Sequence, residues 1–327
     1  MKTPILVGFS LASSAALLAP SFGVNAQSYP DRPVRMLVGF APGGGTDIFA
    51  RVIAQKISET WGQQMVVENR PGATGTIVSG IVAKARPDGY ILMMGTVATQ
   101  AILPEIMSKL PYDPEKDFVP VTLAASVPHF VLVHPSLPVM SVKALIALAK
   151  ANPGKLTFPS AGNGSTPHLA GEMFKTMAGV DLVHVPYKGS GQSMQDVLAG
   201  QHPVTFDTVA AVAHFVREGR LRALAVTSAK RVPEFPALPT VAEAGVPGYE
   251  MTSWYGVFAP AETPAPIISK LHADINRVLQ MPDVRERLNG MGVDPILTRS
   301  PAAFAAMVHA DIVRYAKVVK AANLRID

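Results

Sequence analysis

The chain has 327 residues, of which 48% are hydrophobic and 16% charged, a composition that excludes disorder and is long enough for two lobes with cores of their own. It contains no cysteine, which excludes disulfides, thiolate metal sites and cysteine nucleophiles. The formal net charge is +5, but no basic stripe with interleaved aromatic residues occurs, so we expect no nucleic-acid partner. We interpret the densest basic set as a solvated surface: Arg217, Arg220, Arg222, Lys230 and Arg231.

Residues 1–26 have the pattern of a secretion signal peptide. Lys2 supplies a positive start, Ile5–Pro20 is apolar and small, and Val24-Asn25-Ala26 fits the small-x-small cleavage rule. An uncleaved anchor is disfavoured, because the apolar run is shorter than the ~20 residues that span a bilayer and polar residues interrupt it. We therefore expect cleavage after Ala26 and a soluble, periplasmic protein with no later membrane span.

The first half of the mature chain alternates strand and helix patterns. Val34–Phe40 reads as a buried strand, and Asp47–Trp61 as an amphipathic helix with a period near 3.6. Short apolar strands of this kind are typical of a parallel sheet covered on both faces, and the alternation predicts a doubly wound α/β sheet. The other elements expected here are a strand at Gln64–Glu68, a helix at Ala73–Ala85 and a strand at Tyr90–Gly95.

Two long β-rich segments divide the chain. Val119–Val133 predicts a strand that crosses between lobes, and Met251–Ala259 predicts the return crossing. Two crossings suit a hinge about a central cleft, with residues 27–125 and 258–327 in lobe 1 and 126–257 in lobe 2. We expect helices at Val142–Ala151, Pro167–Ala178, Ser193–Gly200, Val209–Arg217, Ala265–Gln280, Pro282–Asn289 and Pro301–Ala322, and strands at Leu156–Pro159, Leu182–Pro186, Val204–Phe206 and Leu221–Thr227.

A glycine-rich loop joins the first strand to the first helix. Val38–Asp47 reads V-G-F-A-P-G-G-G-T-D, and a similar loop, S-A-G-N-G-S, occupies Ser160–Ser165. A strand, a glycine-rich loop and a helix start together form an anion site, because free N–H groups point outward and the helix dipole favours negative charge. One such loop in each half predicts a clamp around a small anion at the carboxyl ends of the strands.

Nucleotide-binding fingerprints do not fit the first loop. Glu68 stands where a ribose-binding acid would, but Ile48 occupies the position that requires Gly or Ala, and no G-K-[ST] follows. Asp47 suits a capping acid for the first helix. A purely structural turn is the alternative interpretation of the three glycines.

Candidate catalytic groups lack partners in the sequence. Ser160 and Ser165 are not in a G-x-S-x-G elbow, because Asn163 holds a glycine position. His168 is either a ligand contact or a structural hydrogen-bonding group, and Asp207 either accepts from a ligand hydroxyl or ammonium or caps the next helix. His184 packs inward, whereas Tyr187 suits the cleft wall. The eight histidines show no H-E-x-x-H and no close pairing with acids, so we expect no metal and no cofactor.

Eleven short motifs occur in one order along nearly the full mature length. They are Tyr29–Pro33, Phe40–Asp47, Glu68–Ala73, Pro87–Tyr90, Leu110–Pro114, Pro153–Leu156, Ser165–Glu172, His184–Ser190, Ala223–Arg231, Pro239–Gly245 and Trp254–Gly256. In these segments the chain resembles the Bug-type solute receptors of tripartite tricarboxylate transporters. The resemblance implies a periplasmic two-lobe, Venus-flytrap receptor that holds carboxylates between the loops Phe40–Asp47 and Ser160–His168, largely through backbone amides and ordered water.

Two departures from the family pattern concern the distal ligand contacts. Thr208 stands where the family commonly has Asn, and Pro203 replaces an apolar residue ahead of the same strand. Aliphatic and aromatic acids both stay open as ligands, since Phe40, Tyr187 and Trp254, together with Tyr255, suit either an aromatic ligand or core packing.

We therefore predict a non-catalytic receptor for a small mono- or dicarboxylate, monomeric and read by membrane transporter subunits. A ligand-sensing receptor for a membrane sensor kinase is the first alternative and an exported hydrolase the second. The ligand-binding residues that we expect are Phe40, Ala41, Gly43, Gly44, Gly45, Thr46, Asp47, Thr96, Thr99, Ser160, Gly162, Asn163, Gly164, Ser165, His168, Tyr187 and Asp207.

Overall fold

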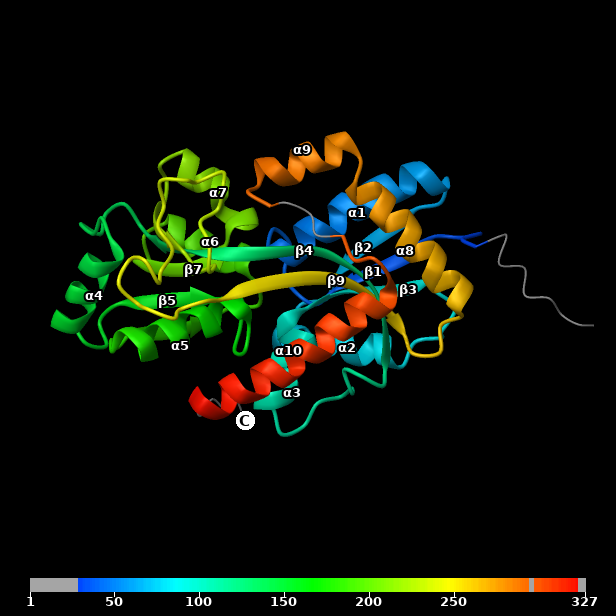
Figure 1. Cartoon of the computed structure of the whole chain (residues 1–327), viewed down its shortest axis with the longest axis horizontal. Coiled ribbons are helices and arrows are strands. Elements are labelled where there is room, and N and C mark those ends of the chain that lie inside the picture. The colour runs from blue at the N-terminus through cyan, green and yellow to red at the C-terminus, as the bar shows by residue number, and fades with distance from the viewer. Residues whose placement is uncertain (1–28, 294–296, 323–327) are drawn as a thin grey trace, which may run out of the picture.

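Two long antiparallel strands, β4 (Phe118–Val133) and β9 (Thr252–Pro260), run side by side between two lobes (Figure 1). The structure, a computed structural model, describes residues 29–293 and 297–322. The segment interpreted as a signal peptide lies outside the described residues. The predicted two-lobe α/β architecture with two crossing strands is confirmed.

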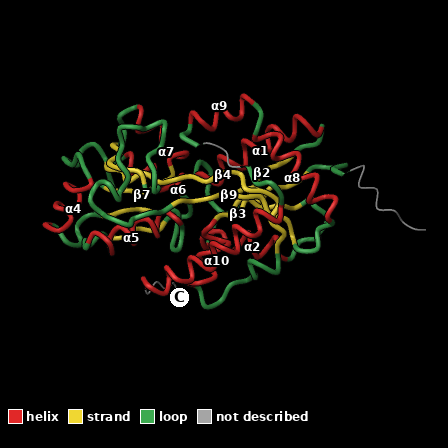
Figure 2. Tube along the Cα trace, in the orientation of Figure 1, coloured by secondary structure: helices red, strands yellow, loops and turns green. Residues whose placement is uncertain are grey.

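Helices and strands alternate in both lobes (Figure 2). The helices α1, α2, α3, α8, α9 and α10 belong to the same part of the molecule as β1 and the start of β4. The helices α4 to α7 surround the far end of β4. The elements of the first group are β1 (Val34–Val38), α1 (Gly45–Trp61), β2 (Met65–Asn69), η2 (Ala73–Gly75), α2 (Thr76–Ala83), β3 (Ile91–Thr96), η3 (Ala98–Ile102), α3 (Leu103–Ile106), α8 (Ala265–Leu279), α9 (Pro282–Gly290) and α10 (Pro301–Ala322). Those of the second are α4 (Val142–Ala151), β5 (Thr157–Ser160), α5 (Thr166–Ala178), β6 (Val183–Pro186), α6 (Ser190–Leu198), β7 (Val204–Thr208), α7 (Val209–Arg217) and β8 (Arg222–Val226).

The main sheet is mixed: the parallel sheet expected from the first half of the chain is found in β2-β1-β3, and the other strand pairings of the main sheet are antiparallel. Its order is β2-β1-β3-β9-β4-β7, with β8 on the other side of the far end of β4. Only β1 pairs in parallel, with β2 and β3; every pairing of β9 and β4 is antiparallel. Helices connect β1, β2 and β3, as parallel pairing requires, whereas β9 enters from the opposite lobe and runs antiparallel to β3 and β4 on either side of it. A separate parallel pair joins β5 to β6.

Residue alternation along the strands separates two apolar cores on opposite faces of the sheet. Met36 and Val38 pack with α1 and α8 on one face, and Leu37 packs with α10 on the other. Along β4 the faces exchange: Val121 belongs to the first core and Leu123 to the second, although they are two residues apart. The pairing with β9 shifts register at this point, and the irregularity reverses the side-chain alternation. Each core therefore extends continuously through both lobes.

One helical segment near the cleft was not predicted. After β3 the chain forms the π-helical turn η3 and the short α3, where the sequence A-T-Q-A-I has no surface periodicity because all five residues are buried. Thr96 and Thr99 brace its start reciprocally: each backbone N–H donates to the hydroxyl of the other, at 3.1 and 3.2 Å. π-Turns are often found at functional sites.

Phe304 of α10 anchors that helix on the crossing strands. Its ring is fully buried and contacts those of Trp254 and Phe258, with centroids 5.6 and 5.2 Å apart. We predict that Phe304→Ala lowers the free energy of unfolding by about 3–5 kcal/mol, the cost of emptying an aromatic core site. Val313→Ala, an exposed change on the same helix, is expected to stay within about 0.5 kcal/mol. Chemical denaturation measures both, and equal effects would contradict this packing role.

Candidate functional site

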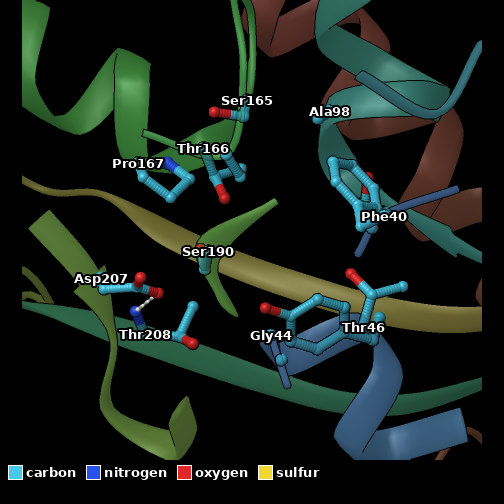
Figure 3. Close-up of a pocket in the computed structure, with 14 residues that line it drawn as sticks. Phe40, Gly44, Thr46, Ala98, Ser165, Thr166, Pro167, Ser190, Asp207 and Thr208 are labelled. Carbon is cyan, nitrogen blue, oxygen red and sulfur yellow. Dashed lines mark hydrogen bonds between the residues drawn. The ribbon is translucent and has the colours of Figure 1, made fainter. Parts of the chain in front are cut away.

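A cavity lies where the two glycine-rich loops meet, next to the crossing strands (Figure 3). It encloses about 380 Å³, its open mouth included. Its wall comes from loops that follow β1, β3 and β5 and from the junction of β7 with α7. The lining residues are Phe40, Gly44, Gly45, Thr46, Thr96, Ala98, Ala161, Ser165, Thr166, Pro167, Ser190, Asp207, Thr208 and Tyr255.

Four helices begin at this cavity, and none of them is capped by a side chain. The residues before α1, α5, α6 and α7 are Gly44, Ser165, Gly189 and Thr208, and none accepts a capping hydrogen bond on its side chain. Away from the cavity, α2, α3, α8 and α9 also lack a side-chain cap, whereas the Ser141 hydroxyl before α4 accepts from the N–H of Ala144 at 3.2 Å. The first N–H groups of a helix have no partner within it, and the dipole makes that end positive. The cavity wall is therefore rich in backbone donors.

Asp47 holds the first glycine-rich loop in shape. Its carboxylate accepts from the N–H of Gly43 at 3.0 Å, from Asn69 Nδ2 at 2.8 Å and from Arg51 Nε at 3.0 Å. Burial would raise the pKa of Asp47, but the hydrogen bonds from Arg51, Gly43 and Asn69 outweigh it and hold the pKa below its ordinary value. The Asp47 side chain is thus committed to the loop and does not line the cavity.

Two stacked histidines support the second loop in the same way. The rings of His168 and His184 lie 3.9 Å apart; His168 Nδ1 accepts from the N–H of Gly164 at 3.0 Å, and His184 Nε2 lies 2.6 Å from Ser160 Oγ. Burial lowers the pKa of His168 to about 4 and that of His184 to about 3. Both rings are therefore neutral, as the acceptor role of His168 requires. Ser160 Oγ also accepts from the N–H of Gly162.

Each glycine-rich loop forms a hydrogen bond with the opposite lobe. The N–H of Ala41 donates to the carbonyl of Lys188 at 3.1 Å, and the Thr74 hydroxyl donates to the carbonyl of Asn163 at 2.6 Å. A Cβ at Gly191 would lie 2.0 Å from the carbonyl oxygen of Pro42, so the approach requires glycine. These contacts describe lobes closed over the cavity.

The structure brings part of the predicted set of ligand-binding residues together at the wall. Of the remainder, Thr99 braces Thr96, and Tyr187 Oη donates to Asp196 and lies 3.0 Å from His202 Nε2. The predicted residues on the wall are Phe40, Gly44, Gly45, Thr46, Thr96, Ser165 and Asp207. Those away from it are Ala41, Gly43, Asp47, Thr99, Ser160, Gly162, Asn163, Gly164, His168 and Tyr187; Gly43 lines a second cavity, between the first loop and α6 and α7.

Sequence reasoning missed several wall residues that carry hydroxyl groups. Thr166 and Ser190 are the first residues of α5 and α6, and Thr208 directly precedes α7. Positions at a helix start after a β-strand are the signal that would have found them. The hydroxyls of Thr208 and of Ser165 are buried without a hydrogen-bond partner, which is costly unless a ligand or water supplies one. The other missed wall residues are Ala98, Ala161 and Pro167; Tyr255, for which the sequence left an aromatic-ligand contact and core packing both open, also lies on the wall.

The charge on the cavity wall is unusual for an anion site. The lining includes no lysine, arginine or histidine, and its one ionisable acid is Asp207. Burial raises the pKa of Asp207 to about 6, although the N–H of Thr208 donates to its carboxylate at 2.7 Å. Among the described residues no cluster of His, Asp or Glu has the arrangement of a metal site, and no described helix is long and apolar enough to cross a bilayer.

Residues 49–324 match the family described as Tripartite tricarboxylate transporter family receptor. The chain belongs to this family. It is similar to Protein BugT of Bordetella pertussis, with 37% identity over 322 residues, 98% of this chain and 97% of that protein. Its structure is similar to that of R. palustris Rpa4515 with adipate (TM-score 0.88, 41% identity, 91% and 99% of the two chains covered). It is also similar to MatC from Rhodopseudomonas palustris with bound malate (TM-score 0.84, 34% identity, 89% and 100% covered).

Family membership confirms the resemblance found in the sequence. The family consists of periplasmic solute receptors for a transporter and is not an enzyme family.

The raised pKa of Asp207 makes stability depend on pH. A carboxyl whose pKa is raised on folding, here from 3.8 to about 6, destabilises the fold where it is ionised, so stability rises as the pH falls from 6 towards 4. We predict that Asp207→Asn raises the free energy of unfolding of the ligand-free receptor by roughly 2–3 kcal/mol at pH 7, and that the difference shrinks as the pH falls from 6 towards 4 and is absent at lower pH. Denaturation at several pH values measures it. Asp181→Asn, at an exposed carboxyl, is the matched control; a pH-independent effect of Asp207→Asn would contradict the prediction.

Proposed function

We propose that this receptor captures a small mono- or dicarboxylate in the cavity between its lobes. One observation carries the proposal: four uncapped helix starts meet in a wall that has no cationic side chain. Such a wall holds an anion through backbone N–H groups and helix dipoles, with the buried hydroxyls of Ser165 and Thr208 as further partners. The related structures with adipate and malate support carboxylates as the ligand class.

Within the cavity we propose an orientation for the ligand. One carboxylate lies between the starts of α1 and α5, at Gly44–Thr46 and Ser165–Thr166. A second carboxylate beside Asp207 would repel it unless one of the two were protonated. We therefore place a hydroxyl, an apolar group or a protonated carboxyl of the ligand next to Asp207.

The lobe contacts supply a mechanism for signalling occupancy. A ligand touched by both loops favours the closed state, because it can contact both lobes at once only there. The hydrogen bonds of Ala41 with Lys188 and of Thr74 with Asn163 join the two lobes in that state. We propose that membrane transporter subunits read this closed state in a monomeric receptor. We also propose that lobe 1 comprises residues 27–125 and 258–327 and lobe 2 residues 126–257, and that residues 1–26 are a signal peptide cleaved after Ala26.

A thermal-shift screen tests the ligand class. We expect the protein from residue 27 onward to be stabilised by one class of acid in a panel of adipate, malate, benzoate and related carboxylates. A ligand at a hundred times its dissociation constant adds about 2.7 kcal/mol, which is several degrees at roughly 2–4 °C per kcal/mol. Neutral sugars and inorganic phosphate serve as controls. No shift with any acid, even after the protein has been unfolded and refolded to remove bound ligand, would contradict the proposal.

A substitution at Gly44 tests the position of the site. The backbone there (φ −84°, ψ 168°) is open to any residue, and a Cβ would point at Ser190 Cβ at 3.5 Å. We predict that Gly44→Val fills the cavity and weakens binding by roughly a hundredfold or more, about 2.7 kcal/mol, while the ligand-free protein melts within a few degrees of wild type. Gly290→Val is the control, because a Cβ at Gly290 meets nothing within 4 Å. Isothermal titration compares them, and unchanged affinity in Gly44→Val would rule out this placement.

A transport role and a sensing role share the same binding event. Deleting the gene separates them: loss of uptake supports the transporter, and loss of gene induction with uptake intact supports a sensor kinase.

A further inference from the structure

Three buried polar side chains meet behind the cavity wall, at the point where the crossing strands pass beneath the start of α5. They are His129 of β4, Ser253 of β9 and Thr166, the first residue of α5. Ser253 Oγ donates to Thr166 Oγ1 at 2.6 Å, and His129 Nε2 lies 3.2 Å from Ser253 Oγ and 3.3 Å from Thr166 Oγ1. Only Thr166 also lines the cavity, and Figure 3 shows its hydroxyl oxygen directed into the space between the labelled residues.

The protons of this triad follow from burial. The His129 ring is fully buried, and burial lowers its pKa to about 3, so the imidazole carries one proton. Nδ1 has no hydrogen-bond partner, whereas Nε2 faces two hydroxyl oxygens. A proton on Nδ1 would bury an unpartnered N–H, so we place it on Nε2, where it is donated to the hydroxyls.

That assignment fixes the role of Thr166. The Ser253 hydroxyl donates to Thr166, and Nε2–H of His129 donates to one hydroxyl or the other. In either case the Thr166 oxygen accepts, and its hydrogen finds no acceptor within the triad. Among the described residues, Thr166 Oγ1 makes hydrogen bonds with these two side chains alone. Its hydrogen is therefore free for the cavity, and an oxygen that accepts hydrogen bonds is a stronger donor.

The start of α5 needs such a donor. Its second residue is Pro167, which has no N–H, so α5 offers one backbone donor fewer than a helix start ordinarily does. Thr166 Oγ1–H, at the same end of the helix, supplies a donor in this region of the wall. The Thr166 hydroxyl thus supplies a donor at the helix start where Pro167 lacks a backbone N–H.

We propose that Thr166 is a specificity-determining donor to the ligand carboxylate, and that His129 and Ser253 are positioning residues that commit its hydrogen to the cavity. The inference rests on the proposed function, because it requires an acceptor in the cavity. An uncommitted hydroxyl can donate or accept and tolerates either kind of ligand group. A committed donor favours a carboxylate over the corresponding primary amide, whose NH₂ group presents donors.

Isothermal titration with the tightest-binding acid among adipate, malate and benzoate, and with its primary amide, tests this role. We expect Thr166→Val to weaken binding of the acid roughly tenfold to a hundredfold, the range for a hydrogen bond to a charged group, and to reduce the preference for acid over amide. Thr166→Ser keeps the hydroxyl and is expected to bind within about threefold of wild type. Thr176→Val is the matched control: the same change on the same helix, at an exposed hydroxyl bonded to the carbonyl of Glu172.

A double-mutant cycle separates positioning from structural support. Ser253→Ala is expected to weaken binding when Thr166 is present and to have no further effect in Thr166→Val, because it acts only through that hydroxyl. Melting of the ligand-free proteins reports folding, and Thr166→Ala replaces Thr166→Val if the latter does not fold.

The possible results distinguish the two proposals. A wild-type protein that binds none of the acids contradicts the proposed function and the inference together. Wild-type binding with unchanged affinity in Thr166→Val overturns the inference alone. Additive losses in the Ser253→Ala, Thr166→Val double variant overturn the positioning role.

Discussion

The site depends on backbone N–H groups at the starts of four helices that neither their own helices nor capping side chains can satisfy. A buried donor without an acceptor costs free energy, so these helix starts require an acceptor from outside the chain. Two features bring the four helix starts together: the strand ends, which position the loops, and the closure of the lobes. Unpaired backbone donors, more than the shape of the cavity, therefore determine which ligand groups can bind there.

The side chains that brace the two glycine-rich loops add no net charge to the cavity. Asp47 is compensated by Arg51, and His168 and His184 are neutral because they are buried. The wall itself lacks fixed cations among the described residues. Attraction for an anion thus comes from dipoles at close range, and falls off within about one helical turn. Such a site discriminates by where hydrogen-bond donors lie, which gives single hydroxyl groups a large influence on ligand choice.

The sequence predicted the elements that depend on local pattern. The glycine-rich loops, the long crossing strands and the helices Val142–Ala151, Val209–Arg217 and Pro301–Ala322 follow from periodicity, glycine and capping residues, and their bounds match the structure. The antiparallel pairing of β9 with β3 was not predicted, because which strands become neighbours depends on contacts far apart in the chain. The π-turn η3 lacks a periodic signal because all five of its residues are buried.

The sequence also did not predict which residues of the loops line the cavity and which brace the loops. Asp47, Ser160 and His168 look like ligand contacts because they are polar and lie at the ends of the glycine-rich loops, yet their side chains turn back to brace the loops. Thr166, Ser190 and Thr208 look like ordinary helix-start residues, yet they line the cavity. Which way a side chain turns in a glycine-rich loop depends on the left-handed conformations around it, such as those of Gly43 and Gly164, and composition does not reveal them.

The two lobes cannot be complete without each other. Between His129 and Val133, β4 pairs with β7 on one side and β8 on the other, while its first part pairs with β9 beside β3. Excising the central lobe would remove β4 from one sheet or the other and leave an unpaired strand edge in the remainder. Both apolar cores would be cut at the same place. Because the lobes share β4 and both cores, we expect them to unfold together and not to be separable modules.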